Sequence, residues 1–263
     1  MDKELYFKKN IMAICKLCGN ENKLVKSHII PKFMFKKMKN EENVFYEVIY
    51  NLDSNKTKTK KTQIEDYDKN ILCETCDNKI LGGIYESYAQ KAIYGGELPI
   101  EVSPKCVNYQ NPNDGAEYSI CKNFDYQKIK NFYLSILWRA SITDRPFFNY
   151  VELGKKHEER IRKILLNNEK VPENEYPIVI TSFMRTENSL ENLIAEPRRI
   201  RTKSGLNGYM FLMDSLQFII YVNSPGHKIT DTIKKLSMKE DEMITMHLPN
   251  GKEIEFLKMF FKK

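Results

Sequence analysis

The chain has 263 residues, of which 41% are apolar and 29% are charged, a composition typical of a folded globular protein rather than a disordered one. Its net charge of +7 is compatible with a polyanionic partner. The excess is spread thinly, because residues 1–95 carry 17 Lys against 13 Asp and Glu, and so only +4. This excludes recognition by bulk charge alone, so binding of a polyanion would rely on local basic patches.

The first third of the chain predicts two strands and a helix. Residues 24–30 form a β-rich run that is stopped by Pro31, and a second short strand is expected over 67–72. After Cys76, apolar residues recur at helical spacing on one face. These residues are Ile80, Ile84, Tyr88 and Ala92.

A lysine-rich insert over 36–62 separates the two predicted strands. It contains a turn signal at 51–55, followed by a run of lysines. The run consists of Lys56, Lys58, Lys60 and Lys61. Two interpretations stay open for it: a solvated loop, or a set of contacts to a nucleic-acid backbone.

The rest of the chain predicts an α+β arrangement. Clustered Gly, Pro, Asn and Asp predict an irregular connector over 96–120. Apolar residues between 129 and 140 predict an amphipathic helix, and a charged helix is expected over 155–167. Alternation predicts strands over 209–213, 218–222 and 253–259. We therefore expect a module over 1–95, the connector, and an α+β domain over 121–263.

Four cysteines form two C-x-x-C pairs far apart in the sequence. Two thiolates with two residues between them on a tight turn can chelate one ion, so each pair is half of a tetrahedral zinc site. We predict a structural Zn²⁺ site formed by Cys15, Cys18, Cys73 and Cys76. The alternative, scattered core thiols, does not account for two such pairs.

A histidine lies between the two pairs, in Ser27-His28-Ile29-Ile30-Pro31, and Asp77 directly follows the last cysteine. Hydrolysis of a phosphodiester needs an activated water and a divalent cation that neutralises charge on the phosphoryl oxygens. A histidine suits the base at neutral pH, and a carboxylate suits Mg²⁺. The plainer interpretations are a structural histidine and a carboxylate stabilised by a helix N-terminus.

The motifs C-K-L-C at 15–18, S-H-I-I-P at 27–31 and L-C-E-T-C-D-N at 72–78 resemble the zinc-containing, four-cysteine branch of the HNH (ββα-metal) endonucleases. The resemblance covers about residues 15–92 and implies a zinc-braced, treble-clef-like ββα-metal module. It also implies that His28 is the general base and that Asp77 binds a catalytic Mg²⁺ or Mn²⁺. Ser27, Asn78 and Asp68 are further candidates for that metal site.

By the same resemblance, the expected activity is hydrolysis of double-stranded DNA. Bacterial proteins similar to this one act in defence against phage. The partners that the resemblance implies, besides DNA, are a second copy of the chain or a protein of a defence system. The chain departs from the family at two positions, since Ser27 stands where an acid is usual and Asp77 where His or Asn is usual. Two other functions therefore stay open: a zinc-braced module that binds nucleic acid without cutting it, and a protein–protein adaptor.

The remaining features concern location. The charged start of the chain lacks the apolar region of a signal peptide, and the longest apolar stretch, 209–222, is interrupted by Asp214 and Gln217. We expect a cytoplasmic protein without a membrane partner. In that setting metal binding is favoured over disulfides, so Cys106 and Cys121 are predicted to be separate thiols.

Overall fold

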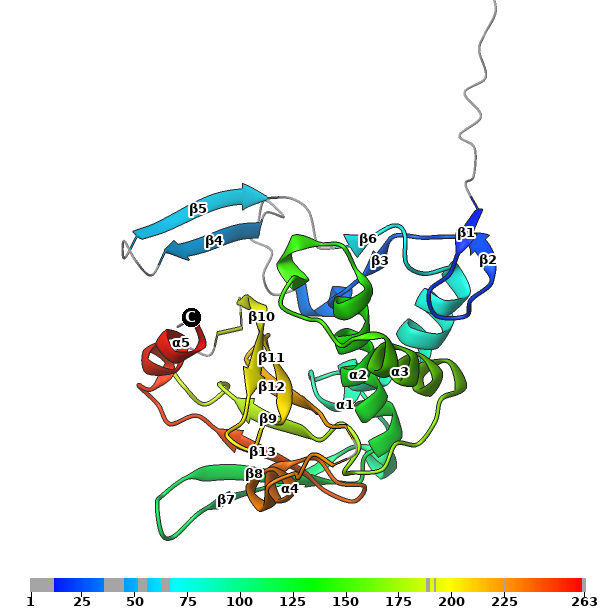
Figure 1. Cartoon of the computed structure of the whole chain (residues 1–263). Helices are drawn as coiled ribbons and strands as arrows, with labels where there is room; N and C mark the ends of the chain where they lie inside the picture. The colour runs from blue at the N-terminus through cyan, green and yellow to red at the C-terminus, as the bar shows by residue number, and fades with distance from the viewer. Residues whose placement is uncertain are drawn as a thin grey trace, which may run out of the picture.

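The computed structural model describes residues 12–35, 45–51, 56–62, 67–187, 190–191, 193–224 and 226–261. These residues form a mixed α+β fold built on a seven-stranded sheet with the order β10-β11-β12-β9-β13-β8-β7 (Figure 1). Neighbouring strands are antiparallel except for the parallel pair β13–β9. The strands are β7 (Lys105–Gln110), β8 (Glu117–Lys122), β9 (Ile178–Ser182), β10 (Ile194–Arg201), β11 (Asn207–Met213), β12 (Leu216–Val222) and β13 (Met243–His247).

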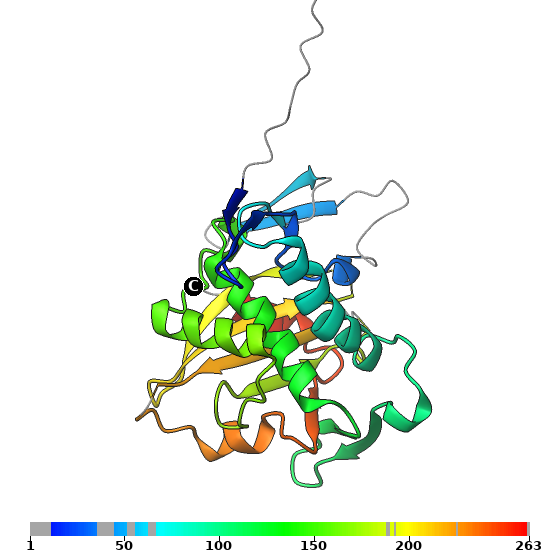
Figure 2. The ribbon, with the colours of Figure 1, turned by 90° about the vertical axis from the view of Figure 1, so that its right-hand side faces the viewer.

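Helices cover both faces of this sheet. α2 (Tyr126–Ile142) and α3 (Lys155–Asn167) lie on one face (Figure 2). There Tyr133 packs on Phe218 of β12, with 4.6 Å between ring centroids. α5 (Glu253–Phe261) covers part of the opposite face through Phe256, whose ring lies 4.8 Å from that of Phe183. α4 (Asp231–Leu236) packs on the same face through Ile233, in a separate hydrophobic cluster. Short 3₁₀ turns occur at η1 (Lys32–Phe35), η3 (Ile100–Val102) and η4 (Pro146–Phe148).

The first third of the chain forms a small unit at one end of α2 and α3 (Figure 1). Three antiparallel strand pairs occur among its described residues, and the last of these strands leads into a long helix. The pairs are β1 (Met12–Ile14) with β2 (Glu21–Lys23), β3 (Ser27–His28) with β6 (Tyr67–Asp68), and β4 (Phe45–Asn51) with β5 (Lys56–Thr62). The helix consists of η2 (Thr75–Glu86) and α1 (Ser87–Ala92).

The first part of this helix, η2, is wound as a π-helix. An added Cβ at Gly82 would lie 3.1 Å from the carbonyl oxygen of Asp77, and one at Gly83 would lie 3.2 Å from that of Asn78. Both distances are tighter than ordinary contacts, so the two glycines allow the backbone to approach itself in the wider winding. π-Helical turns are uncommon and frequently accompany functional sites.

The helices predicted after Cys76, over 129–140 and over 155–167 are confirmed, as are strands at 209–213 and 218–222. Three predicted strands differ. The one over 24–30 is reduced to Ser27–His28. The one over 67–72 is reduced to Tyr67–Asp68, after which Cys73 forms an isolated bridge with Leu24. The one over 253–259 is wrong, because these residues belong to α5.

The predicted irregular connector contains regular structure. Within 96–120 lie the edge strand β7 and most of β8, which extend the large sheet. In addition, one hydrophobic cluster runs from Cys15 and Cys76 through α2 to Met243 on the sheet. The two parts predicted as domains therefore share one core.

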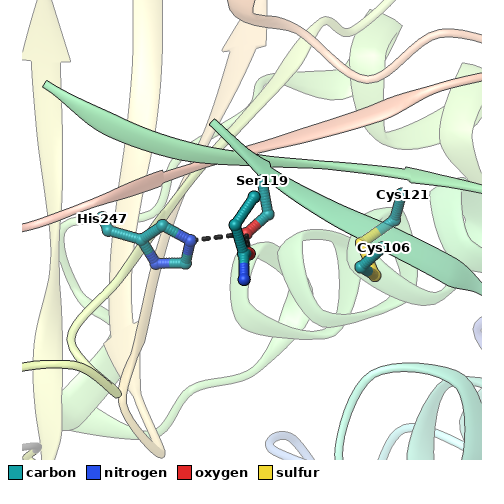
Figure 3. Close-up of a disulfide and its surroundings, with 5 residues drawn as sticks. Cys106, Ser119, Cys121 and His247 are labelled. Carbon is teal, nitrogen blue, oxygen red and sulfur yellow. Dashed lines mark hydrogen bonds between the residues drawn. A yellow bond between two sulfur atoms is a disulfide. The ribbon is translucent and has the colours of Figure 1, made fainter. Parts of the chain in front are cut away.

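The prediction that Cys106 and Cys121 are separate thiols is wrong. They are opposite one another in the β7–β8 register and form a disulfide, with 4.0 Å between their Cα atoms (Figure 3). Near it, the Ser119 hydroxyl and the His247 Nε2 lie 2.6 Å apart. In the described part of the chain, every helix is too short or too polar to cross a membrane.

Candidate functional site

The first C-x-x-C pair lies on a tight turn between β1 and β2. The turn is closed by two backbone hydrogen bonds, from the Gly19 N–H to the Cys15 carbonyl at 2.8 Å and from the Cys15 N–H to the Asn20 carbonyl at 2.9 Å. Gly19 has φ = +77°, a conformation that glycine adopts without steric cost. The turn therefore presents the thiols of Cys15 and Cys18 to a common point.

The second pair lies where β6 runs into η2. The Cys73 N–H donates to the Cys15 Sγ at 3.3 Å, and the Cys73 carbonyl accepts from the Asp77 N–H at 2.9 Å. The four sulfur atoms of the two pairs all lie within 4.8 Å of one another. Tetrahedral zinc with bonds of about 2.3 Å needs sulfur atoms about 3.8 Å apart, so the cluster has the composition and nearly the size of a zinc site.

The thiols of this cluster already differ in acidity. A hydrogen bond with Cys76 lowers the pKa of Cys15 to about 4, although burial acts in the opposite direction. The same hydrogen bond, together with burial, raises the pKa of Cys76 above its ordinary value. Metal ligation requires thiolates, and a hydrogen bond that lowers the pKa of one of the thiols acts in that direction. The four cysteines can therefore hold a metal ion such as zinc.

Next to this cluster, Ser27 and Asp77 meet. The Ser27 hydroxyl, which is fully buried, donates to Asp77 Oδ1 at 2.5 Å. Asp77 is half-buried, and its other carboxylate oxygen has no hydrogen-bond partner among the described residues. The contact joins β3 to the start of η2, and it is made by Ser27 and not by His28.

His28 belongs to the other side of the strand pair. In the β3–β6 register, Ser27 is opposite Asp68 and His28 is opposite Tyr67, so the two pairs have their side chains on opposite faces. The ring centroids of His28 and Tyr67 are 6.3 Å apart in an edge-to-face arrangement. His28 is half-buried, one residue from the Ser27–Asp77 contact.

A buried arginine on α2 fixes the backbone at this histidine. Arg139 Nη1 donates to the His28 carbonyl at 2.6 Å, and Arg139 Nη2 pairs with Glu86 at 2.6 Å. Arg139 is 1% exposed, so these contacts are made almost out of water. We did not predict this role from the sequence, although the signal was present: an arginine three residues after Ile136 on the apolar stripe of a helix needs a buried partner.

Other contacts clamp the small unit onto the helices. The Lys16 ammonium donates to the Ile142 carbonyl at 2.5 Å, and Arg162 Nη1 on α3 donates to the Leu17 carbonyl at 2.6 Å. The donor of the first bond and the acceptor of the second both belong to the Cys15–Cys18 turn. The position of the cysteine cluster relative to α2 and α3 is therefore set by side chains from both parts of the chain.

The remaining predicted metal ligands are less well placed. Both carboxylate oxygens of Asp68 are engaged, Oδ1 by the Asn70 N–H at 2.8 Å and Oδ2 by the Thr143 hydroxyl at 2.7 Å. Asn78 is exposed, one residue further along η2. The predicted backbone contacts lie outside the described side chains. These are Lys56, Lys58, Lys60 and Lys61.

Comparison with protein-family models, with curated proteins and with solved structures finds no match for this chain. The functional argument therefore rests on the geometry of the site and on its chemistry.

Proposed function

We propose that the protein is a metal-dependent endonuclease that hydrolyses phosphodiester bonds of DNA. The observation that carries the proposal is the juxtaposition of three features within one strand–strand–helix unit. His28 lies on the first strand, its neighbour Ser27 contacts Asp77 at the start of the helix, and four clustered cysteines brace the unit. This is the order of parts that a zinc-braced ββα-metal module requires.

In this proposal His28 is the base that takes a proton from the attacking water. An imidazole is suited to this step because its ordinary pKa is the closest of all side chains to neutral pH. Its backbone is held by Arg139, and its ring is flanked by Tyr67. A base whose backbone is fixed loses little freedom when it aligns with a phosphate, which is how positioning contributes to rate.

Asp77 is the residue best placed to hold a catalytic Mg²⁺ or Mn²⁺. One of its oxygens is occupied by Ser27 and the other is open among the described residues. Mg²⁺ usually keeps several waters and takes only one or two protein carboxylates, so a single aspartate is a sufficient anchor. When bound, the ion supplies positive charge to the phosphoryl oxygens. Ser27 orients the carboxylate, and Asp68 supports Thr143 rather than the ion.

Plasmid cleavage tests the proposal directly. Purified wild type and His28→Ala are incubated with supercoiled plasmid and Mg²⁺ or Mn²⁺, with and without chelator. We expect nicking that depends on the added ion and is lost in the variant. His227→Ala is the matched control, because His227 is an exposed histidine near α4. Equal nicking by wild type and His28→Ala would remove His28 from the mechanism.

A second function is favoured by one specific observation: the metal site has a single open carboxylate. Ser27 supplies a hydroxyl where an acid would bind an ion more strongly, and Asp68 is consumed by internal hydrogen bonds. A module that binds DNA without cutting it would have such a site. Salt-sensitive binding of DNA with no cleavage under Mg²⁺ or Mn²⁺ would select this function. A role in defence against phage is carried by the family resemblance alone.

A further inference from the structure

We propose that Lys26, Tyr67 and Lys69 form a binding site for the phosphate backbone of DNA beside His28. This inference rests on the proposed function, because it names the part of the surface that would hold the substrate at the same site. It replaces the lysines of the insert, whose side chains are not described, with two lysines whose positions are known.

The strand pair brings these side chains together. Lys26 directly precedes Ser27 of β3 and Lys69 directly follows Asp68 of β6, so the two lysines flank the pair at the same end. Lys26 is two positions from His28 and Lys69 is two positions from Tyr67, the spacing at which side chains of extended backbone share a face. Their ammonium groups confirm it, since Lys26 Nζ lies 5.1 Å and Lys69 Nζ lies 5.8 Å from the centroid of the Tyr67 ring.

Within the part of the chain that the structure describes, neither lysine has a carboxylate partner of the kind that some surface lysines have. Lys163, Lys239 and Lys252 each pair with a carboxylate within one helix turn or tight turn. Neither Lys26 nor Lys69 forms an ion pair with any described residue, and both are exposed.

Two ammonium groups held near one ring repel each other. The Tyr67 ring offsets part of this repulsion, because a cation over an aromatic face is attracted to it. Bound phosphate groups would do more, because a phosphate oxygen accepts a charge-assisted hydrogen bond from an ammonium group.

A DNA backbone fits this face better than a small anion does. The site is open and lies next to the histidine that would act on the substrate. On the opposite face of the strand pair Ser27 and Asp68 are buried, whereas the Asp77 carboxylate that Ser27 contacts is only half-buried. The Tyr67 ring adds an aromatic surface within about 6 Å of both cations, a combination found where proteins bind nucleic acid.

The test measures binding and cutting on the same full-length preparations. Binding of a fluorescently labelled DNA duplex is followed by anisotropy over a series of salt concentrations, without added Mg²⁺ or Mn²⁺ and without chelator, so that zinc is retained. The site variant is Lys26→Gln/Lys69→Gln. The control, Lys234→Gln/Lys252→Gln, removes the same charge from two exposed lysines elsewhere. Zinc content and the fluorescence of Trp138 check folding.

We expect the Kd of the site variant to rise about tenfold at low salt. The plot of the logarithm of the association constant against the logarithm of salt concentration should become shallower, its negative slope losing about 2 in magnitude. The control should stay close to wild type. A site variant that binds as tightly as the control would overturn the inference, even if the wild type cuts DNA. Binding that depends on these lysines in a protein that never cuts would support the inference and refute the nuclease. A wild type that binds no DNA would refute both.

Discussion

Replacing Arg139 by methionine should destabilise the protein more than any exposed charge change. The substitution keeps most of the side-chain volume but removes a guanidinium that is 1% exposed. It leaves Glu86, whose side chain is 18% exposed, without its ion-pair partner, and it leaves the His28 carbonyl without its donor. Breaking a buried pair on one side costs about 3–5 kcal/mol. Because Glu86 retains some contact with water, we expect the lower end, about 3 kcal/mol.

The assay is urea unfolding followed by the fluorescence of Trp138, the single tryptophan of the chain, which is buried beside Arg139. Arg185→Met is the matched control. The Arg185–Glu117 pair is of similar length, 2.9 Å, but both side chains are largely in solvent, at 34% and 50% exposed. We expect a loss below about 1 kcal/mol for this control.

Two further variants make the test specific to the ion pair. Adding Glu86→Gln to Arg139→Met should recover about 1–2 kcal/mol, because it removes the uncompensated charge. Arg139→Lys, which keeps the charge but loses the planar fork, should lie between wild type and Arg139→Met. If Arg139→Met loses no more stability than Arg185→Met, the buried network does not hold β3 against α2, and the reasoning is refuted.

Three other predictions concern separate parts of the molecule. Cys73→Ser should reduce bound zinc from about one ion per chain to none and unfold the first third, as measured by elemental analysis and circular dichroism; unchanged zinc would contradict the four-cysteine site. Cys106→Ser/Cys121→Ser should cost at most about 3 kcal/mol, given a sequence separation of 15, with faster hydrogen exchange in β7 and β8 as its readout. Lys130 is buried, which lowers its pKa to about 7 from 10.5, so the unfolded chain binds more protons between these values. The free energy of unfolding should therefore rise from pH 7 to pH 9 in the wild type relative to Lys130→Met, and parallel pH profiles for the two proteins would contradict this.

Several elements could be predicted because their signals are local. The helix over 155–167 and the strands over 209–213 and 218–222 follow from side-chain periodicity within one segment. The clustering of Cys15, Cys18, Cys73 and Cys76 follows from the chelate spacing of each pair, which leaves few other uses for four thiols.

Other features depend on pairings that no local pattern records. The disulfide between Cys106 and Cys121 forms because the pairing of β7 with β8 aligns the two residues. No sequence pattern around either cysteine predicts this pairing. The residue pattern at 253–259 is equally compatible with a helix that packs Phe256 against Phe183. So short an apolar run does not distinguish the periodicity of a helix from that of a strand. The link from Arg139 to His28 spans 111 residues and appears only when α2 lies against β3.

The most direct test of the central claim is the rate of plasmid nicking by wild type and His28→Ala, compared at equal zinc content and at neutral pH. The account predicts nicking by the wild type that requires Mg²⁺ or Mn²⁺, and a loss of at least about 100-fold in the variant, as expected when a general base is removed. Wild-type protein that contains zinc and is folded, but nicks no DNA under either ion, would contradict it.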